Sequence, residues 1–123
     1  MKMKKVIAML GAAAVILLVG VLLWVRGDVR DTAARAQSLF PGDRVEALTA
    51  LALSEEHSLE DRNRAVWALS HVGDARALPT LEQLKTDAPC DHARHVCQYE
   101  LLKALSASRG EKFRPFSILN KVE

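Results

Sequence analysis

The chain has 123 residues, with 17 Lys and Arg against 15 Asp and Glu, and a net charge of +2 at pH 7. Three of those lysines lie in the first five residues, so the rest carries about −1 and lacks the basic excess typical of nucleic-acid-binding domains. It also contains no Gly-rich phosphate loop, no Ser/His/Asp arrangement and no paired-carboxylate site. The sequence therefore predicts a protein that is not an enzyme and has no cofactor, nucleic-acid partner or small-molecule substrate.

An uncharged apolar run follows the N-terminal lysines and spans Val6–Val25. As a helix it would be roughly 30 Å long, which matches the hydrocarbon core of a bilayer. A cleaved secretory signal has an apolar core of about 7–15 residues and small residues at its cleavage site. This run is longer, and it ends in Leu22-Leu23-Trp24-Val25-Arg26 instead. We therefore expect residues 1–27 to be cytoplasmic lysines followed by an uncleaved, single-pass transmembrane anchor.

The charges that flank the anchor predict its orientation. Lysines without any acidic residue precede it, whereas Arg26 and Arg30 alternate with Asp28 and Asp31 after it. The side with the excess of basic residues usually stays in the cytoplasm. We therefore expect a cytoplasmic N-terminus and a C-terminal domain on the periplasmic or extracellular side.

The part that follows the anchor is rich in alanine and leucine and poor in aromatic residues, which favours an all-α fold. Asp28–Phe40 has a helical apolar stripe and no proline, so it is expected to continue the membrane helix until Pro41-Gly42 stops it. This predicts a juxtamembrane helix and turn over 28–42 and a helical domain over 43–110. The tail, 111–123, is left unassigned.

Apolar periodicity predicts four helices within the helical domain. They are Asp43–Leu53, Asp61–Val72, Ala75–Thr86 and His92–Ser108. Gly73 is expected to end the second helix and Asp74 to cap the third. Pro79 falls near the first turn of the third helix, where proline costs least, and Gly110 ends the fourth.

Two of these helices share the pattern D-R-x-[ER]-A-[LV]-x-A-L, at Asp43–Leu51 and Asp61–Leu69. A weaker echo, Glu100–Leu105, lies 36 residues beyond the matching part of the second. In this pattern the aspartate would cap the helix, the alanines would allow close approach of neighbours, and the leucine would fill the gap between layers. Recurrence at such spacing predicts a stacked-helix array.

The stretch Arg64–Leu81 resembles the core of the HEAT-like repeat family. Counted from Arg62, just before this stretch, it has an R-x-x-A-x-x-A-L type of helix, followed by a Gly-Asp turn and a second helix that opens A-L-P-x-L. The resemblance is close over about 25 residues and loose over 43–108. It implies a short α-solenoid whose concave face binds another protein, with no catalytic residue. An ordinary four- or five-helix bundle remains the alternative, followed by a tetratricopeptide-like pair.

The segment Cys90–Cys97 contains both cysteines and two histidines, in the pattern C-x-H-x2-H-x-C. We predict a disulfide between Cys90 and Cys97, because disulfides persist outside the cytoplasm. Seven helical residues would span about 10 Å, whereas a bridge needs Cα atoms within about 7 Å, so Cys90 must lie off the helix. A zinc or copper site formed with His92 and His95 is an alternative with no standard spacing. Two unpaired thiols are the third possibility.

These features predict a membrane-anchored, non-enzymatic module that presents HEAT-like repeats to a protein partner on the extracytoplasmic side, with Val6–Val25 as the membrane contact. The alternative is a structural accessory subunit of a larger membrane complex. Its transmembrane helix would pack on partner helices through the small residues Gly11, Ala12–Ala14 and Gly20.

Overall fold

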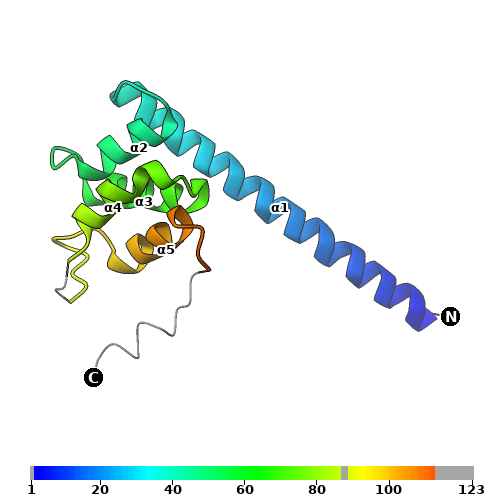
Figure 1. The fold of residues 1–123 in the computed structure, drawn as a ribbon. Helices are drawn as coiled ribbons and strands as arrows, with labels where there is room; N and C mark the ends of the chain where they lie inside the picture. The colour runs from blue at the N-terminus through cyan, green and yellow to red at the C-terminus, as the bar shows by residue number, and fades with distance from the viewer. Residues whose placement is uncertain (1, 87–88, 113–123) are drawn as a thin grey trace. The chain divides into compact units, whose positions relative to one another are not determined.

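The computed structural model describes residues 2–86 and 89–112 (Figure 1). It divides into two compact units, Met1–Asp31 and Thr32–Glu123, each treated by itself below. Throughout the described residues the regular structure is helical, without strands, so the predicted all-α class is confirmed. Of the predicted tail, residues 113–123 lie outside the described part.

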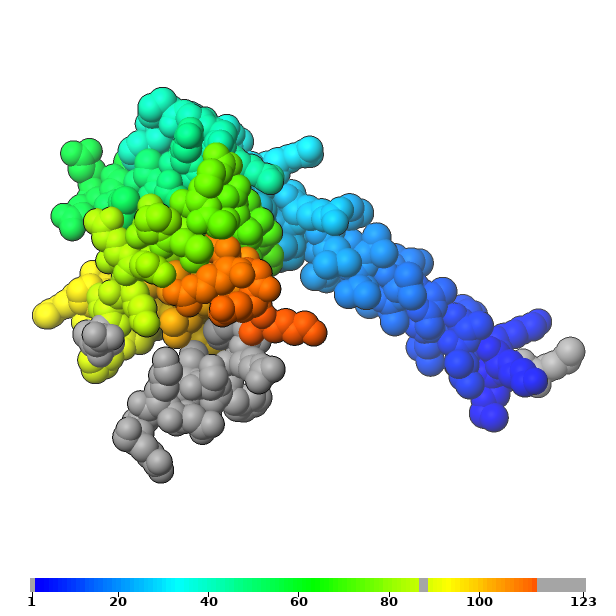
Figure 2. Space-filling model, viewed as in Figure 1, coloured from blue at the N-terminus to red at the C-terminus, as the bar shows by residue number. Residues whose placement is uncertain are grey.

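Helix α1, Lys2–Leu39, carries the apolar run and continues beyond it without interruption. This confirms that 28–39 extends the first helix, as the absence of proline predicted. In the first unit the apolar side chains are uncovered: the most apolar 18-residue window has a mean hydropathy of 3.0 and is 0% buried (Figure 2). By length and composition this helix can cross a membrane.

The last turns of α1 belong to the second unit, where Thr32, Ala33 and Ala36 are buried. The Arg35 guanidinium reaches the Asp61 carboxylate at 3.1 Å. The helix then gives way to the Pro41-Gly42 turn, as predicted. These three small side chains let the end of α1 join the core of the second unit.

Helix α2, Arg44–Leu53, begins with a complete capping box. The Asp43 carboxylate accepts from the N–H groups of Val45 and Glu46, and the Glu46 carboxylate accepts from the Asp43 N–H at 2.9 Å. Gly42, with φ +110°, leaves room for this return, because a Cβ there would collide with the Glu46 side chain. The predicted cap at Asp43 is confirmed.

Helix α3, Leu59–Val72, begins two residues before the predicted start. Its cap is Ser58, whose hydroxyl accepts from the Asp61 N–H at 3.2 Å. The prediction that Asp61 caps this helix is therefore wrong, because Asp61 lies inside its first turn and instead pairs with Arg35. Gly73, with φ +64°, ends the helix as predicted.

The predicted helix Ala75–Thr86 is divided into a 3₁₀ turn, η1 (Ala75–Ala77), and helix α4, Leu78–Leu84. Proline causes the division: Pro79 has no N–H to donate to the Ala75 carbonyl, which accepts from the Leu78 N–H instead. The Asp74 carboxylate accepts from the Arg76 N–H at 2.9 Å, so the predicted cap at Asp74 is confirmed.

Helix α5, Gln98–Ser108, begins six residues later than predicted. The Asp91 carboxylate accepts from the Ala93 N–H at 3.0 Å, and the Asp91 carbonyl accepts from the His95 N–H at 2.9 Å. This local turn competes with the helix and excludes residues 92–97 from it. Gly110, with φ +72°, follows the helix end as predicted.

The core of the second unit is built mainly from alanine and leucine. Helix α3 lies between α2 and α5 and packs against both, while α4 contacts α5 and α2 (Figure 1). The positions buried in α3 reappear 36 residues later in α5, as the sequence echo predicted. The matching buried residues are Ala65, Ala68 and Leu69 in α3, and Leu101, Ala104 and Leu105 in α5.

Helices α3 and α5 are parallel and aligned at both ends. At their starts the Cys97 N–H donates to Asn63 Oδ1 at 2.7 Å. At their ends a Cβ on Gly73 would lie 3.3 Å from the Ala107 carbonyl oxygen. Both contacts join residues 34 apart in sequence. Because the same spacing of 34 residues holds at both ends, the two helices run side by side in one register.

Candidate functional site: the Cys90–His92–Cys97 cluster

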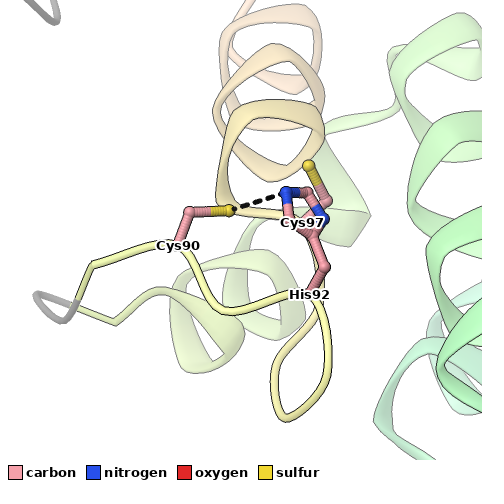
Figure 3. A group of neighbouring side chains, drawn as sticks. All are labelled: Cys90, His92 and Cys97. Atoms are coloured by element: carbon pink, nitrogen blue, oxygen red, sulfur yellow. Dashed lines mark hydrogen bonds between the residues drawn. The ribbon is translucent and has the colours of Figure 1, made fainter.

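Two sulfurs and a ring nitrogen come together in the loop that leads into α5 (Figure 3). The ligand atoms of Cys90, His92 and Cys97 all lie within 4.8 Å of one another. Cys90 Sγ lies 3.5 Å from His92 Nε2. Cys90 and His92 are exposed, whereas Cys97 is half-buried. The cluster is therefore open to solvent on one side and anchored on the other.

The two cysteines are unbonded in the structure. Both lie outside α5, with Cys97 at its N-cap position, so the geometric requirement that Cys90 lie off the helix is met. The disulfide between Cys90 and Cys97 stays a prediction.

The base of the loop is fixed by two side chains from outside the cluster. Asn63, on α3, accepts from the Cys97 N–H. The Gln98 amide accepts from the Thr86 N–H at 2.9 Å and donates to the Val96 carbonyl at 3.0 Å. Val96 is 3% exposed and adds an apolar contact to the core. Cys97 is thus held in place from both sides.

The other end of the loop is organised by Asp91. Besides the backbone turn, its carboxylate lies 3.7 Å from the Arg94 guanidinium. His92 follows directly and shares the cluster with the cysteines, whereas His95 lies outside it. Of the four candidate ligands in the sequence pattern, the structure therefore brings three together.

No family model, curated protein or solved structure matches this chain. Sequence reasoning missed Asn63 and Gln98, because neither belongs to a recognisable motif. The role of Asn63 depends on the α3–α5 register, and that of Gln98 on the position of α5 beside the end of α4, neither of which a local pattern specifies.

A second polar cluster joins the starts of α2 and η1. The Arg76 guanidinium contacts Asp43 at 2.6 Å and Asp74 at 3.0 Å. The pKa of Asp43 is lowered by the backbone N–H of Glu46 and by Arg76, and the pKa of Asp74 is lowered mainly by its side-chain hydrogen bond with Arg76. The hydrogen bonds that Arg76 donates to Asp74 and Asp43 raise its own pKa. These groups are caps and ion pairs, and they tie two helix starts together.

The chemistry available to the Cys–His cluster is that of two thiols and an imidazole. The thiols can form a disulfide, or as thiolates they can share a metal ion with the histidine. Redox and metal chemistry are two uses that these residues support.

Proposed function

We propose that this protein is a membrane-anchored, non-enzymatic interaction module, in which α1 crosses the bilayer and two HEAT-like helical pairs bind a protein partner outside the cytoplasm. The first pair is α2 with α3, and the second is η1 and α4 with α5. The observation that carries the proposal is the aligned, parallel packing of α3 on α5.

That packing favours stacked pairs over an up-and-down bundle. In such a bundle consecutive helices are antiparallel neighbours, so α3 would pack extensively on α4. Here the extensive contacts of α3 are with α2 and α5. Stacked helical pairs place the second helix of one pair beside the second helix of the next, in parallel. The contacts between α3 and α5 follow this arrangement.

The first helices of the two pairs support the same arrangement. Arg76, in η1, contacts Asp43, the cap of α2, so these two starts also lie together. The α4 side chain that reaches the core is Leu81, which is 0% exposed. Stacked helical arrays commonly serve as binding surfaces, which supports a role in protein binding.

The anchor and its orientation rest on α1. Its apolar side chains are uncovered within the first unit, and only lipid or other apolar helices would remove them from water. Lysines alone precede the run, whereas acidic and basic residues alternate after it. The charge difference supports a cytoplasmic N-terminus.

Thiol labelling in intact cells tests the orientation. With Cys97→Ser, Cys90 is the remaining cysteine of the full chain and is exposed. We expect a membrane-impermeant maleimide to label it without permeabilisation. A matched control has Lys4→Cys in a chain without Cys90 and Cys97, and it should be labelled only after permeabilisation. The reverse pattern would place the helical pairs in the cytoplasm and contradict the proposal.

A helix exchange separates the module from an accessory subunit. Replacing Val6–Val25 with an unrelated membrane-spanning sequence keeps the tether and the helical pairs but removes Gly11 and Gly20. An interaction module should retain its cross-linked partner after the exchange. Loss of the partner would instead favour a subunit whose membrane helix packs on partner helices.

A further inference from the structure

We propose that Cys90, His92 and Cys97 bind one soft metal ion, Zn²⁺ or Cu⁺, through two thiolates and one imidazole. This site goes beyond the proposed function, which needs no metal. Thiolate and imidazole donors together select this class of cation over hard ions such as Mg²⁺ and Ca²⁺.

The spacing of the donor atoms fits a single ion. Zinc binds sulfur at about 2.3 Å and imidazole nitrogen at about 2.0–2.1 Å, so donors on one zinc ion lie within roughly 4 Å of one another. The three donors here already lie within 4.8 Å. The donor atoms need to approach one another by less than about 1 Å to share one ion. The exposed side chains of Cys90 and His92 can make this change by rotating.

The loop holds two of the donors, Cys97 and His92, by contacts that do not involve the donor atoms. The Cys97 backbone N–H donates a hydrogen bond to Asn63 Oδ1. The side-chain amide of the next residue, Gln98, donates one to the Val96 carbonyl. The turn at Asp91 fixes the chain on both sides of His92. Such surrounding contacts lower the cost of ordering the ligands on metal binding.

The number of ligands is three, and the outer side of the cluster faces solvent. Water can therefore complete a tetrahedral zinc site, whereas Cu⁺ can be held by the three protein ligands alone. His95 is outside the cluster and is not needed in either case.

The same two sulfurs would form the predicted disulfide, so one molecule can have only one of the two. The disulfide requires an oxidant that removes two electrons and two protons, and it makes no use of His92. Metal binding requires only that the thiols lose their protons. The contact between Cys90 Sγ and His92 Nε2 places the histidine among the donors, which favours the metal site.

Titration of the reduced full-length protein in detergent tests the proposal, with Zn²⁺ and Cu⁺ in separate experiments. We expect one equivalent of at least one ion per chain. Co²⁺ substituted for Zn²⁺ should give thiolate charge-transfer absorption. His92→Asn should weaken binding by more than about 10-fold, since it removes a direct ligand. His95→Asn, in the same loop, is the matched control and should bind like the wild type.

Three results would overturn the inference. The first is the absence of stoichiometric binding by both ions, and the second is binding by His92→Asn that equals the wild type. The third is recovery of the chain from its own membranes with Cys90 and Cys97 bridged, detected as a mass lower by two hydrogens and the loss of free thiols. Circular dichroism of each variant checks that its helices are retained.

Discussion

Asn63 on α3 accepts a hydrogen bond from the backbone N–H of Cys97, at the N-cap of α5, at 2.7 Å. The bond joins two segments 34 residues apart and serves two purposes. It fixes the start of α5 against the start of α3, and it holds one sulfur-bearing residue of the Cys–His cluster. Fold and candidate site therefore share this residue.

Replacing Asn63 tests this double role. Asn63→Ala leaves the half-buried Cys97 N–H without its partner and should lower the free energy of unfolding by about 1–2 kcal/mol. Asn63→Asp keeps an acceptor oxygen and should lose less. Hydrogen exchange at the Cys97 amide measures the effect locally, and unchanged exchange in Asn63→Ala would exclude the bond.

Gly73 tests the contact between the ends of α3 and α5. Gly73→Ala should destabilise the domain in two ways: about 1–2 kcal/mol for a side chain at positive φ, and a further loss from contact with the Ala107 carbonyl. Gly110→Ala is the matched control, because its φ is also positive, at +72°, but no atom of the described residues lies within 4 Å of the added Cβ. Equal losses in urea unfolding would mean that the helix ends do not touch.

Acid should weaken the link between the two helix starts. Asp43 and Asp74 have pKa values below their ordinary value of 3.8. Their stabilising effect is therefore complete above pH 3.8 and is lost as the pH falls through the lowered values. Arg76→Gln removes the guanidinium that lowers the pKa of both aspartates. The free energy of unfolding of this variant should therefore fall less steeply as the pH decreases through this range. A parallel pH dependence in the wild type and the variant would contradict this.

Asp43→Asn separates the cap from the charge. Asparagine caps a helix about as well as aspartate, but it does not pair with the Arg76 cation. Asp43→Asn should therefore lose only the contribution of the ion pair with Arg76, which added salt screens. Asp43→Ala should lose more, because it removes the cap as well. Urea titrations at low and high salt distinguish the two contributions.

Leu81 tests the attachment of α4 to the core. It is fully buried, so Leu81→Ala should cost about 2–5 kcal/mol. Leu84→Ala, on the same helix but half-buried, should cost clearly less. If the two variants lose the same stability, α4 is not packed through Leu81.

Much of this fold follows from local chemistry that the sequence displays. The apolar run, the cap at Asp43 and the stop at Gly73 each depend on residues that are neighbours in the chain. The start of α5 was predicted six residues early, because the turn at Asp91 uses the backbone groups of residues 91–95 and keeps them out of the helix. Pro79 lies in the first turn of α4, as predicted, but its missing N–H leaves Ala75–Ala77 as a separate 3₁₀ turn.

The candidate site was only partly predictable. The sequence identifies the donors Cys90, His92 and Cys97, because their types and proximity are visible in it. It does not reveal that His95 is left out, which depends on the turn at Asp91. Nor does it reveal Asn63, whose role arises from tertiary register alone. Local patterns predict which side chains can take part, and packing decides which of them meet.

The aligned helix starts have a consequence for how the domain opens. In a stacked array, stability is the sum of each pair's own stability and its coupling to the next pair. In the proposed stacking the two pairs would share one junction, which includes the contacts of Arg76 with Asp43 and of Asn63 with Cys97. Cooperativity between the two pairs would then depend on that junction. Once it is broken, each pair is left as a lone helical hairpin with an uncovered apolar face, so the two should unfold in a single step.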